Sequence, residues 1–527
     1  MWFVSHVFVV LVFIQTSCAV PPHHYPHPHH PLPHHPLPHH PIPHQPELPQ
    51  CNGIFPQHFS FGVASGAYEH EGAWNIDGKG ENIWDRWVHQ NPGVIMDGTN
   101  GDETADAYHH LDEDVEILNN LTVRHYSFTL SWARLIPLGC GEVNKAAVRH
   151  YQRLLYLLKE NRIEPIVTLY NGDLPQALED QGGFLSDNFV SWYTEYAKIV
   201  FECFGSNVKY WITFNDPTTQ CHEGYGVGTF PPGISNNPGV NEYICGHNIL
   251  KAHASVYHLY DDSYRQTQKG KISIELLGRW HEPATDCQTD IEAAERRMQF
   301  EIGWFAHPIY IGDYPQVMID RIGEMSELQG LCESRLPVFT RKEIEWIKDT
   351  HDFFGLLYYF GFTVRAIEDD SCVSPSYDSD TGAEIIQRIE GDDTYGIRKL
   401  IVWIKNQYCN PSIFILGNGY VTGNRTLEDD DRIEYIKKIL IHIRAAQTND
   451  DARVYGYTYG TFIDGFIRAY GHTFRLGLYD VEFDCPTKPR TARKSVEYFQ
   501  HVCKYGCIDN PCPPRHHHEY FGEHVIY

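Results

Sequence analysis

Short runs rich in β-branched and aromatic residues recur eight times along the chain, and longer amphipathic stretches separate them. This alternation is typical of a parallel α/β sheet, because each strand needs a returning helix before the next parallel strand can begin. Eight such units close into a ring, so the pattern predicts an α/β fold with a single (β/α)8 barrel. The runs expected to form strands are Phe59–Ala64, His125–Ser131, Glu164–Tyr170, Tyr210–Asn215, Lys271–Leu277, Phe353–Tyr359, Ser412–Gly417 and Val454–Phe462.

The segment from residue 151 to residue 163 indicates how the helices lie. Its apolar residues Leu154, Leu155, Leu157 and Leu158 recur at helical spacing, which predicts an outer helix with one face against the barrel. The length of 527 residues suits one barrel with insertions and two tails.

The charge of the chain excludes one class of partner. The formal net charge is −26 at pH 7, and no basic block occurs anywhere in the sequence. A protein of this sign repels the phosphate backbone, so we expect no nucleic-acid partner. The sequence does not identify a protein partner.

The N-terminus resembles a secretion signal. Residues 1–19 contain a short apolar run that ends in Ser17-Cys18-Ala19, a small-x-small pattern suited to cleavage. A membrane anchor is disfavoured because the run is too short and no later apolar stretch reaches about 20 residues. We therefore expect a secreted, extracellular protein that does not bind a membrane.

Secretion bears on the cysteines and on glycosylation. Loss of Cys18 with the signal leaves thirteen of the fourteen cysteines, so an oxidising route permits several disulfides and leaves one thiol over. The C-terminal tail, residues 503–527, contains Cys503, Cys507 and Cys512, for which a disulfide is favoured over a zinc site. Asn120-Leu-Thr and Asn424-Arg-Thr are candidate glycosylation sites.

Residues 20–50 alternate proline with histidine and cannot form a packed core, so we expect an extended tail. Paired imidazoles, His34 with His35 and His39 with His40, suit zinc or copper. A solvated spacer is the equally weighted alternative, because nothing in the segment fixes a coordination geometry.

Five motifs occur in a fixed order between about Phe55 and Val502. They are FPQHFSFGVASGAYEHEGAWNIDGKGENIWD, TLYNGDLPQALED, WITFNDP, DFFGLLYY and VYGYTYGTFIDGF. Together they resemble glycoside hydrolase family 1, the retaining β-glycosidases, and the resemblance implies a barrel over residues 51–502 without a cofactor. It also implies that the ligand is a carbohydrate or a similar small molecule.

The resemblance places the two catalytic carboxyl groups, and both positions are altered. Such enzymes use an acid/base and a nucleophile about 5 Å apart. The acid/base glutamate of the family's NEP motif corresponds to Asp216, which is shorter by one methylene. The nucleophile of the TENG motif corresponds to Gly417, which has no side chain to attack a sugar.

Groups that support the nucleophile in the family are also replaced. The family's strand-two arginine corresponds to Ser127, and the asparagine before the paired tyrosines corresponds to Leu357. An arginine with no carboxylate at residue 417 would be an unpaired buried cation, so these losses are mutually consistent.

The positions that hold the sugar in the family are mostly altered. Asn215 and Tyr359 match the family, whereas Glu69, Asn171, Gly172, Gly460, Ile467 and Arg468 stand where it has glutamine, histidine, tryptophan, tryptophan, glutamate and tryptophan. Glycine at 172 and 460 predicts a larger pocket at the barrel mouth. Alternatively, neighbouring side chains such as Arg468 fill the space.

The leading hypothesis is a secreted, catalytically inactive family member that binds carbohydrate or another small ligand. One alternative is an active β-glycosidase with a relocated nucleophile, for which Glu69 is the candidate carboxylate. The other is an extracellular structural or metal-binding protein that acts through its His/Pro tail.

Overall fold

The computed structural model describes residues 48–49, 53–367, 374–423 and 425–512. The expected signal peptide, the His/Pro tail with His34, His35, His39 and His40, the sequon residue Asn424 and the last part of the C-terminal tail lie outside these residues. Within the described part, no helix has both the length and the apolar character needed to cross a bilayer.

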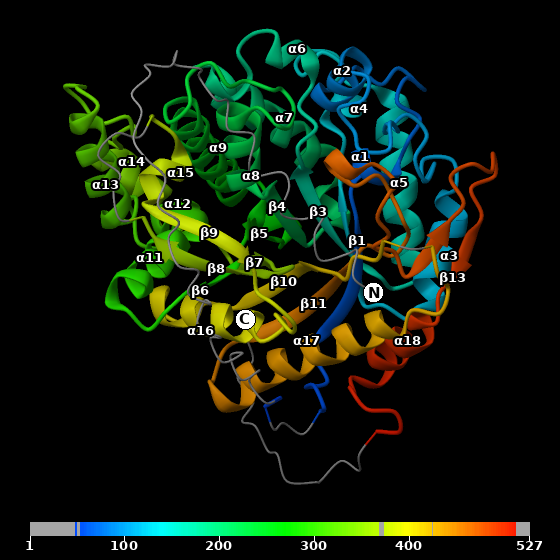
Figure 1. Ribbon diagram of the computed structural model, residues 1–527. Coiled ribbons are helices and arrows are strands. Elements are labelled where there is room, and N and C mark those ends of the chain that lie inside the picture. The colour runs from blue at the N-terminus through cyan, green and yellow to red at the C-terminus, as the bar shows by residue number, and fades with distance from the viewer. Residues whose placement is uncertain (1–47, 50–52, 368–373, 424, 513–527) are drawn as a thin grey trace, which may run out of the picture. The chain divides into compact units, whose positions relative to one another are not determined.

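Eight parallel strands form a closed barrel, as the alternation predicts. Figure 1 shows the ring of strands at the centre of the molecule with helices around it. The order around the ring is β1-β11-β10-β7-β5-β4-β3-β2. The strands are β1 (Ser60–Ser65), β2 (His125–Thr129), β3 (Glu164–Tyr170), β4 (Tyr210–Asn215), β5 (Lys271–Leu277), β7 (Phe354–Leu357), β10 (Ile413–Asn418) and β11 (Val454–Gly460).

The expected strands are all present, and their ends differ from the prediction by one or two residues. β2, β7 and β11 are shorter than expected at their carboxyl ends, where the chain turns into loops and short helices. Asn215 and Gly417 lie within the last two residues of β4 and β10, whereas Asn171 and Asp216 directly follow β3 and β4.

The longer helices surround the ring, and α5 shows why they lie there. The Asn144 side chain caps the first turn by accepting from the Ala146 backbone N–H, and Leu154, Leu155 and Leu158 are buried on one face. The helices of ten or more residues are α3 (Leu111–Asn120), α5 (Lys145–Glu160), α7 (Phe189–Phe204), α9 (Asn241–Ser263), α11 (Gln288–Met298), α13 (Gln316–Leu328), α16 (Gly396–Gln407), α17 (Asp430–Asn449) and α18 (Ser495–Tyr505).

Shorter elements decorate the loops at the carboxyl ends of the strands. Two small sheets, β6-β8-β9 and β12-β13, stand apart from the ring. Their strands are β6 (Trp280–Pro283), β8 (Gly361–Ala366), β9 (Ala383–Arg388), β12 (Tyr479–Val481) and β13 (Arg490–Ala492). The shorter α-helices are α1 (Ala67–His70), α2 (Ile83–Gln90), α4 (Trp132–Leu135), α6 (Gln176–Glu179), α8 (Pro217–His222), α10 (Arg265–Gln268), α12 (Trp304–Tyr310), α14 (Arg341–Ile347) and α15 (Tyr377–Thr381).

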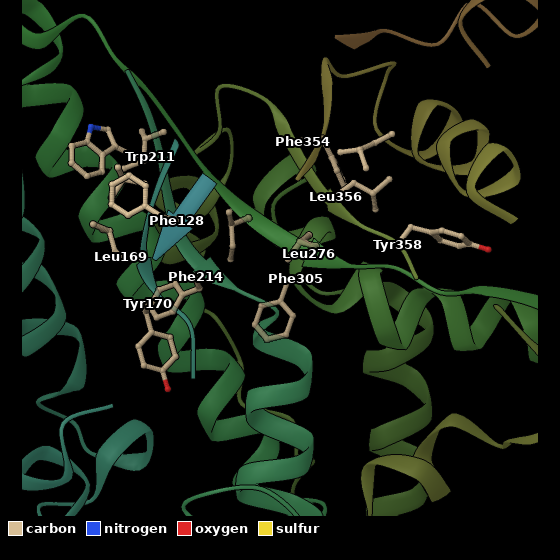
Figure 2. Packing of buried hydrophobic residues seen from close by; sticks show 14 of the residues in the cluster. Phe128, Leu169, Tyr170, Trp211, Phe214, Leu276, Phe305, Phe354, Leu356 and Tyr358 are labelled. Carbon is tan, nitrogen blue, oxygen red and sulfur yellow. The ribbon is translucent and has the colours of Figure 1, made fainter. Parts of the chain in front are cut away.

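Buried side chains form separate clusters, because successive strand residues point to opposite faces of the ring. One small cluster consists of Ile166 of β3, Ile212 of β4, Phe353 just before β7, and Phe414 and Leu416 of β10. The larger cluster lies between strands and helices. Figure 2 shows part of it, including Phe128, Trp211 and Phe214.

One disulfide, Cys221–Cys245, joins α8 to α9. Nine other described cysteines have free thiols, and among them are Cys503, Cys507 and Cys512 of the C-terminal segment. The several disulfides that secretion would permit are therefore represented by one in the described part of the chain.

A buried ion cluster holds the loop that follows β11. Arg493 donates to both carboxylate oxygens of Asp464, at 3.1 and 2.7 Å, and to Asp480 at 3.0 Å. The Arg493 and Asp464 side chains are fully buried. The loop carries Ile467 and Arg468 immediately after this anchor, so the cluster fixes the rim of the barrel mouth.

We predict that Arg493→Met lowers the free energy of unfolding by about 3–5 kcal/mol, because the buried Asp464 loses its main cation and Asp480 is left with Arg425. Chemical denaturation followed by tryptophan fluorescence measures the effect. The matched control is Arg341→Met, since Arg341 pairs with Glu345 at the surface and the two side chains are 92% and 64% exposed. The control should change stability by less than about 1 kcal/mol. Equal effects from both variants would contradict the prediction.

Candidate ligand site at the carboxyl end of the barrel

A pocket of about 490 Å³, counted to its open mouth, lies at the carboxyl ends of β1, β3 and β4. Six of the positions expected from the sequence line it together: Glu69, Asn171, Gly172, Asn215, Asp216 and Arg468. The remaining lining residues are Tyr68, Trp84, Thr219, Gln220, Gly224, Phe230, Pro231 and Phe466. Aromatic rings therefore enclose a small set of charged and amide groups.

Asp216 caps a helix in this structure. Its backbone lies in the left-handed region with φ of 44°, directly before α8. Oδ1 accepts from the Thr219 N–H at 3.2 Å, and Oδ2 lies 3.7 Å from Arg468 Nη2. Burial raises the pKa of Asp216, and the cations Arg468 and Arg279 oppose that shift. Both oxygens thus have partners within the protein, which stabilises the carboxyl group where it is.

Arg468 is the cation of this pocket. Its guanidinium lies 5.5 Å from the centre of the Phe230 ring, which supplies a cation–π contact. Burial raises the pKa of the Glu69 carboxyl, and Arg468 is the largest influence that lowers it. The Asn171 amide nitrogen lies 3.4 Å from both Glu69 oxygens. The three replaced positions 69, 171 and 468 therefore form one polar group around the pocket.

The nucleophile position lies beside a different group of residues. A Cβ atom on Gly417 would lie 2.3 Å from Leu357 Cδ2 and 3.0 Å from the Tyr359 hydroxyl. Ordinary carbon contacts are about 3.5–4 Å, so the Leu357 side chain already takes the space through which a side chain would leave Gly417. Leu357 is itself buried, and so is Ser127 at the lost arginine position. The arginine and the asparagine that support the nucleophile in the family are thus both replaced at this point, whereas Tyr359 is retained.

The two glycines at the family's tryptophan positions differ in whether they line the pocket. Gly172 lines the pocket, and an added Cβ would lie 3.6 Å from Trp84 Nε1 without a clash. Gly460 is not among the lining residues, although its Cβ position is also free of close contacts. Arg468 enters the lining from the rim, whereas Ile467 does not. The space is therefore open at Gly172, and Arg468 borders it.

Sequence reasoning missed Glu275, a carboxyl group on β5 that lies next to the site. Its Oε2 accepts from Asn215 Nδ2 at 2.7 Å, and only 3% of the residue is exposed. Burial, followed by the nearby charge of Asp216, raises the pKa of Glu275 to about 8. The available signal was a lone glutamate inside the apolar run KISIELL. Glu69 is therefore not the only additional carboxyl group near the site.

Glu275 also affects the pKa of Tyr359, the second of the two tyrosines that follow β7. Burial raises the pKa of the Tyr359 hydroxyl, and the charge of Glu275 is the next largest cause of the increase. A neutral Glu275 carboxyl group accepts the Asn215 hydrogen bond and fits a buried position, whereas an ionised one is costly there.

We predict that Glu275→Gln makes the protein more stable than the wild type as pH rises. The pKa of Glu275 is about 8 when folded, against an ordinary value of 4.5. The contribution of the neutral Glu275 carboxyl group to the free energy of unfolding is fully present below pH 4.5 and is lost as the pH rises through 8. Glutamine keeps the acceptor for Asn215 without ionising, so the gain should be near zero at pH 5 and about 3–5 kcal/mol at pH 9.

Urea unfolding at pH 5, 7 and 9 measures this difference. Glu345→Gln is the control, because Glu345 is exposed and pairs with Arg341 at the surface. The control should show no pH trend over this range. A constant difference between wild type and Glu275→Gln at all three pH values would contradict a raised pKa.

Comparison with known proteins agrees with this geometry. Residues 51–506 match the family model described as Glycosyl hydrolase family 1. Myrosinase 1 from Brevicoryne brassicae is 40% identical over 464 residues, which cover 86% of this chain and 99% of that protein. The solved structure titled Aphid myrosinase has a TM-score of 0.82 at 39% identity, and the match covers 86% of this chain and 100% of the other.

A second solved structure, a GH1 β-glucosidase from the fungus Humicola insolens in complex with glucose, has a TM-score of 0.80 at 32% identity. The match covers 86% of this chain and 99% of that chain. The resemblance drawn from the five motifs is thereby confirmed over the whole barrel. The chain belongs to glycosyl hydrolase family 1.

Proposed function

We propose that this protein is a secreted, non-catalytic member of its family that binds a carbohydrate or a similar small ligand at the barrel mouth. One observation carries the proposal: Leu357 occupies the space beside Gly417 where a nucleophile side chain would stand. A retaining mechanism needs a carboxylate there to form the glycosyl intermediate. Gly417 supplies none.

The state of Asp216 supports the same conclusion. Its oxygens contact the Thr219 N–H and the Arg468 guanidinium, so the side chain is held against the protein. An acid catalyst has to reach the leaving oxygen, and a displacement of about 1 Å costs on the order of 10²-fold in rate. A shortened and tethered carboxyl group is poorly placed for that role.

The other carboxyl groups do not replace the nucleophile. Glu275 is hydrogen-bonded to Asn215, and its pKa of about 8 leaves it mostly protonated at neutral pH. Glu69 lies against Asn171 in the lining of the pocket, whereas Gly417 is not among the lining residues. An active enzyme with a relocated nucleophile is therefore the weaker alternative.

Ligand binding is supported by what the pocket retains. Its rings belong to Tyr68, Trp84, Phe230 and Phe466, and its amides to Asn171, Asn215 and Gln220. Apolar walls with a few convergent polar groups are typical of small-molecule sites. The Gln220 Nε2 atom is buried without a partner in the protein, so it is a donor for a ligand. A relative of the same fold binds glucose.

Secretion is supported by the sequence and by one surface position. The signal-like residues 1–19 precede the barrel, and Asn120 of the sequon at the end of α3 is exposed. An exposed asparagine is accessible for glycan attachment. The His/Pro-tail hypothesis concerns residues outside the described part of the chain.

The deciding experiment is an assay with aryl β-glucosides and β-galactosides, with and without azide. We expect no turnover in either condition. Azide replaces a missing carboxylate when only the nucleophile is lost, but here Leu357 lies against the same position and the shorter Asp216 is held by Thr219 and Arg468. Turnover comparable with that of active relatives, or strong azide rescue, would contradict the proposal.

The control for this assay is the Gly417→Glu variant. It should remain at background activity, because Leu357 has to move and Ser127 offers no cation to the new carboxylate. Binding is followed separately by calorimetric titration of glucose and aryl glucosides into the wild type. Heat released by the wild type and lost in Asn171→Ala would support a binding role for this pocket.

A further inference from the structure

A second cluster of reactive side chains lies where the C-terminal segment meets the start of the barrel. α18 ends at Tyr505, and the following residues pair with the segment before β1. The Phe55 N–H donates to the Gly506 carbonyl at 2.8 Å, and the Ile508 N–H donates to the Gly53 carbonyl at 2.9 Å. This pairing fixes the backbone at Cys507. The joint precedes β1, so it lies at the opposite end of that strand from the ligand pocket.

Three metal-binding side chains converge at this joint. One ligand atom each from His501, Cys507 and Cys512 lies within 4.8 Å of the other two. Within the described residues, no other group of three or more histidine, cysteine or acidic side chains has its ligand atoms as close to one another as these. Cys507 is buried, His501 is half-buried and Cys512 is exposed, so the cluster borders on solvent.

The spacing of these atoms fits tetrahedral zinc. Zinc binds thiolate sulfur at about 2.3 Å and imidazole nitrogen at about 2.0–2.1 Å, which places the two ligand atoms about 3.6 Å apart at a tetrahedral angle. Cys512 Sγ and His501 Nε2 lie 3.6 Å apart. The Asp509 carbonyl accepts from Cys507 Sγ at 3.2 Å and from His501 Nε2 at 3.0 Å. These two ligand atoms therefore point toward the same place.

A disulfide is the competing use of the two cysteines. The structure closes one disulfide, Cys221–Cys245, but it keeps Cys507 and Cys512 as free thiols. A Cys507–Cys512 bond would also leave the convergence of His501 on the same point without a role. Two soft thiolates with one imidazole are a ligand set that zinc prefers.

We propose that His501, Cys507 and Cys512 bind one zinc ion, with water in the fourth position. Binding releases the two thiol protons to solvent and replaces the hydrogen bonds that Cys507 Sγ and His501 Nε2 donate to the Asp509 carbonyl, while the imidazole keeps its one proton on Nδ1 so that Nε2 binds the ion. The ion would fasten the C-terminal segment to α18 and, through the backbone pairing at Cys507, to the start of the barrel. This proposal does not depend on the proposed function of the barrel mouth.

The test uses the full chain as secreted, isolated without reductant and stripped of metal by a chelator. Cobalt replaces zinc and gives a near-ultraviolet charge-transfer band only when thiolates are ligands. The histidines of residues 20–50 cannot produce this band. We expect the band to saturate at one cobalt per chain and to disappear when one equivalent of zinc is added.

Variants assign the site. Cys512→Ser and His501→Gln should weaken zinc binding at least about 100-fold, since losing even an outer partner of a ligand costs 10–100-fold. Cys140→Ser is the control, because Cys140 is a free exposed thiol outside the cluster. Cys512 is exposed, so its variant tests the site without a buried substitution; the circular-dichroism spectrum checks that each variant is folded.

Three results would overturn the proposal. The first is mass-spectrometric detection of a Cys507–Cys512 disulfide in the unreduced protein. The second is the absence of a cobalt–thiolate band in the wild type, and the third is a band that the Cys512→Ser substitution leaves unchanged.

Discussion

Closure of the barrel between its first and last strands fixes the place of every site residue. β1 pairs with β11 from Ser60 opposite Gly456 to Ala64 opposite Gly460, and the remaining strands complete the ring. The carboxyl ends of all eight strands then face one mouth. Because the ring is closed and its interior is packed, a replaced side chain changes the chemistry of that mouth and leaves the backbone in place.

Charge explains why the changes at this mouth occur together. The family's nucleophile and its arginine have both gone, leaving Gly417 and Ser127, so no unpaired buried charge remains there. On the other side of the pocket a new cation, Arg468, lies near the two carboxyl groups of Asp216 and Glu69. Glu275 is the additional acid, and it fits a buried position because it is neutral. The family's pair of nucleophile and arginine is thus absent, and Arg468 with Asp216 and Glu69 forms a different group of opposite charges.

The sequence predicted the barrel because strand composition and helical spacing are local properties that a linear pattern records. It also placed Asp216 and Gly417, because these residues lie inside motifs of fixed order. It did not predict that Leu357 fills the space beside Gly417, since that contact depends on the register between the neighbouring strands β7 and β10. Contacts between strands depend on register, which no single run of residues specifies.

Glu275 was missed for a related reason. It lies in a run that reads as a buried strand, and only the pairing of β5 with β4 brings it to Asn215. The convergence of His501, Cys507 and Cys512 likewise needs the turn after α18, although the three residues are close in the sequence. Sequence spacing had favoured a disulfide at this point. The sequence thus gives the residue types, and the fold decides which of them meet.

The central claim is that no carboxylate stands where a glycosyl intermediate would form. The most direct test is incubation with a 2-deoxy-2-fluoro β-glucoside that carries a good leaving group, followed by intact-mass measurement and peptide mapping. Such a reagent attaches to the nucleophile of a retaining glycosidase and is released slowly. The account predicts no mass increase, even after long exposure. A stoichiometric adduct mapped to Glu275, Glu69 or Asp216 would contradict it.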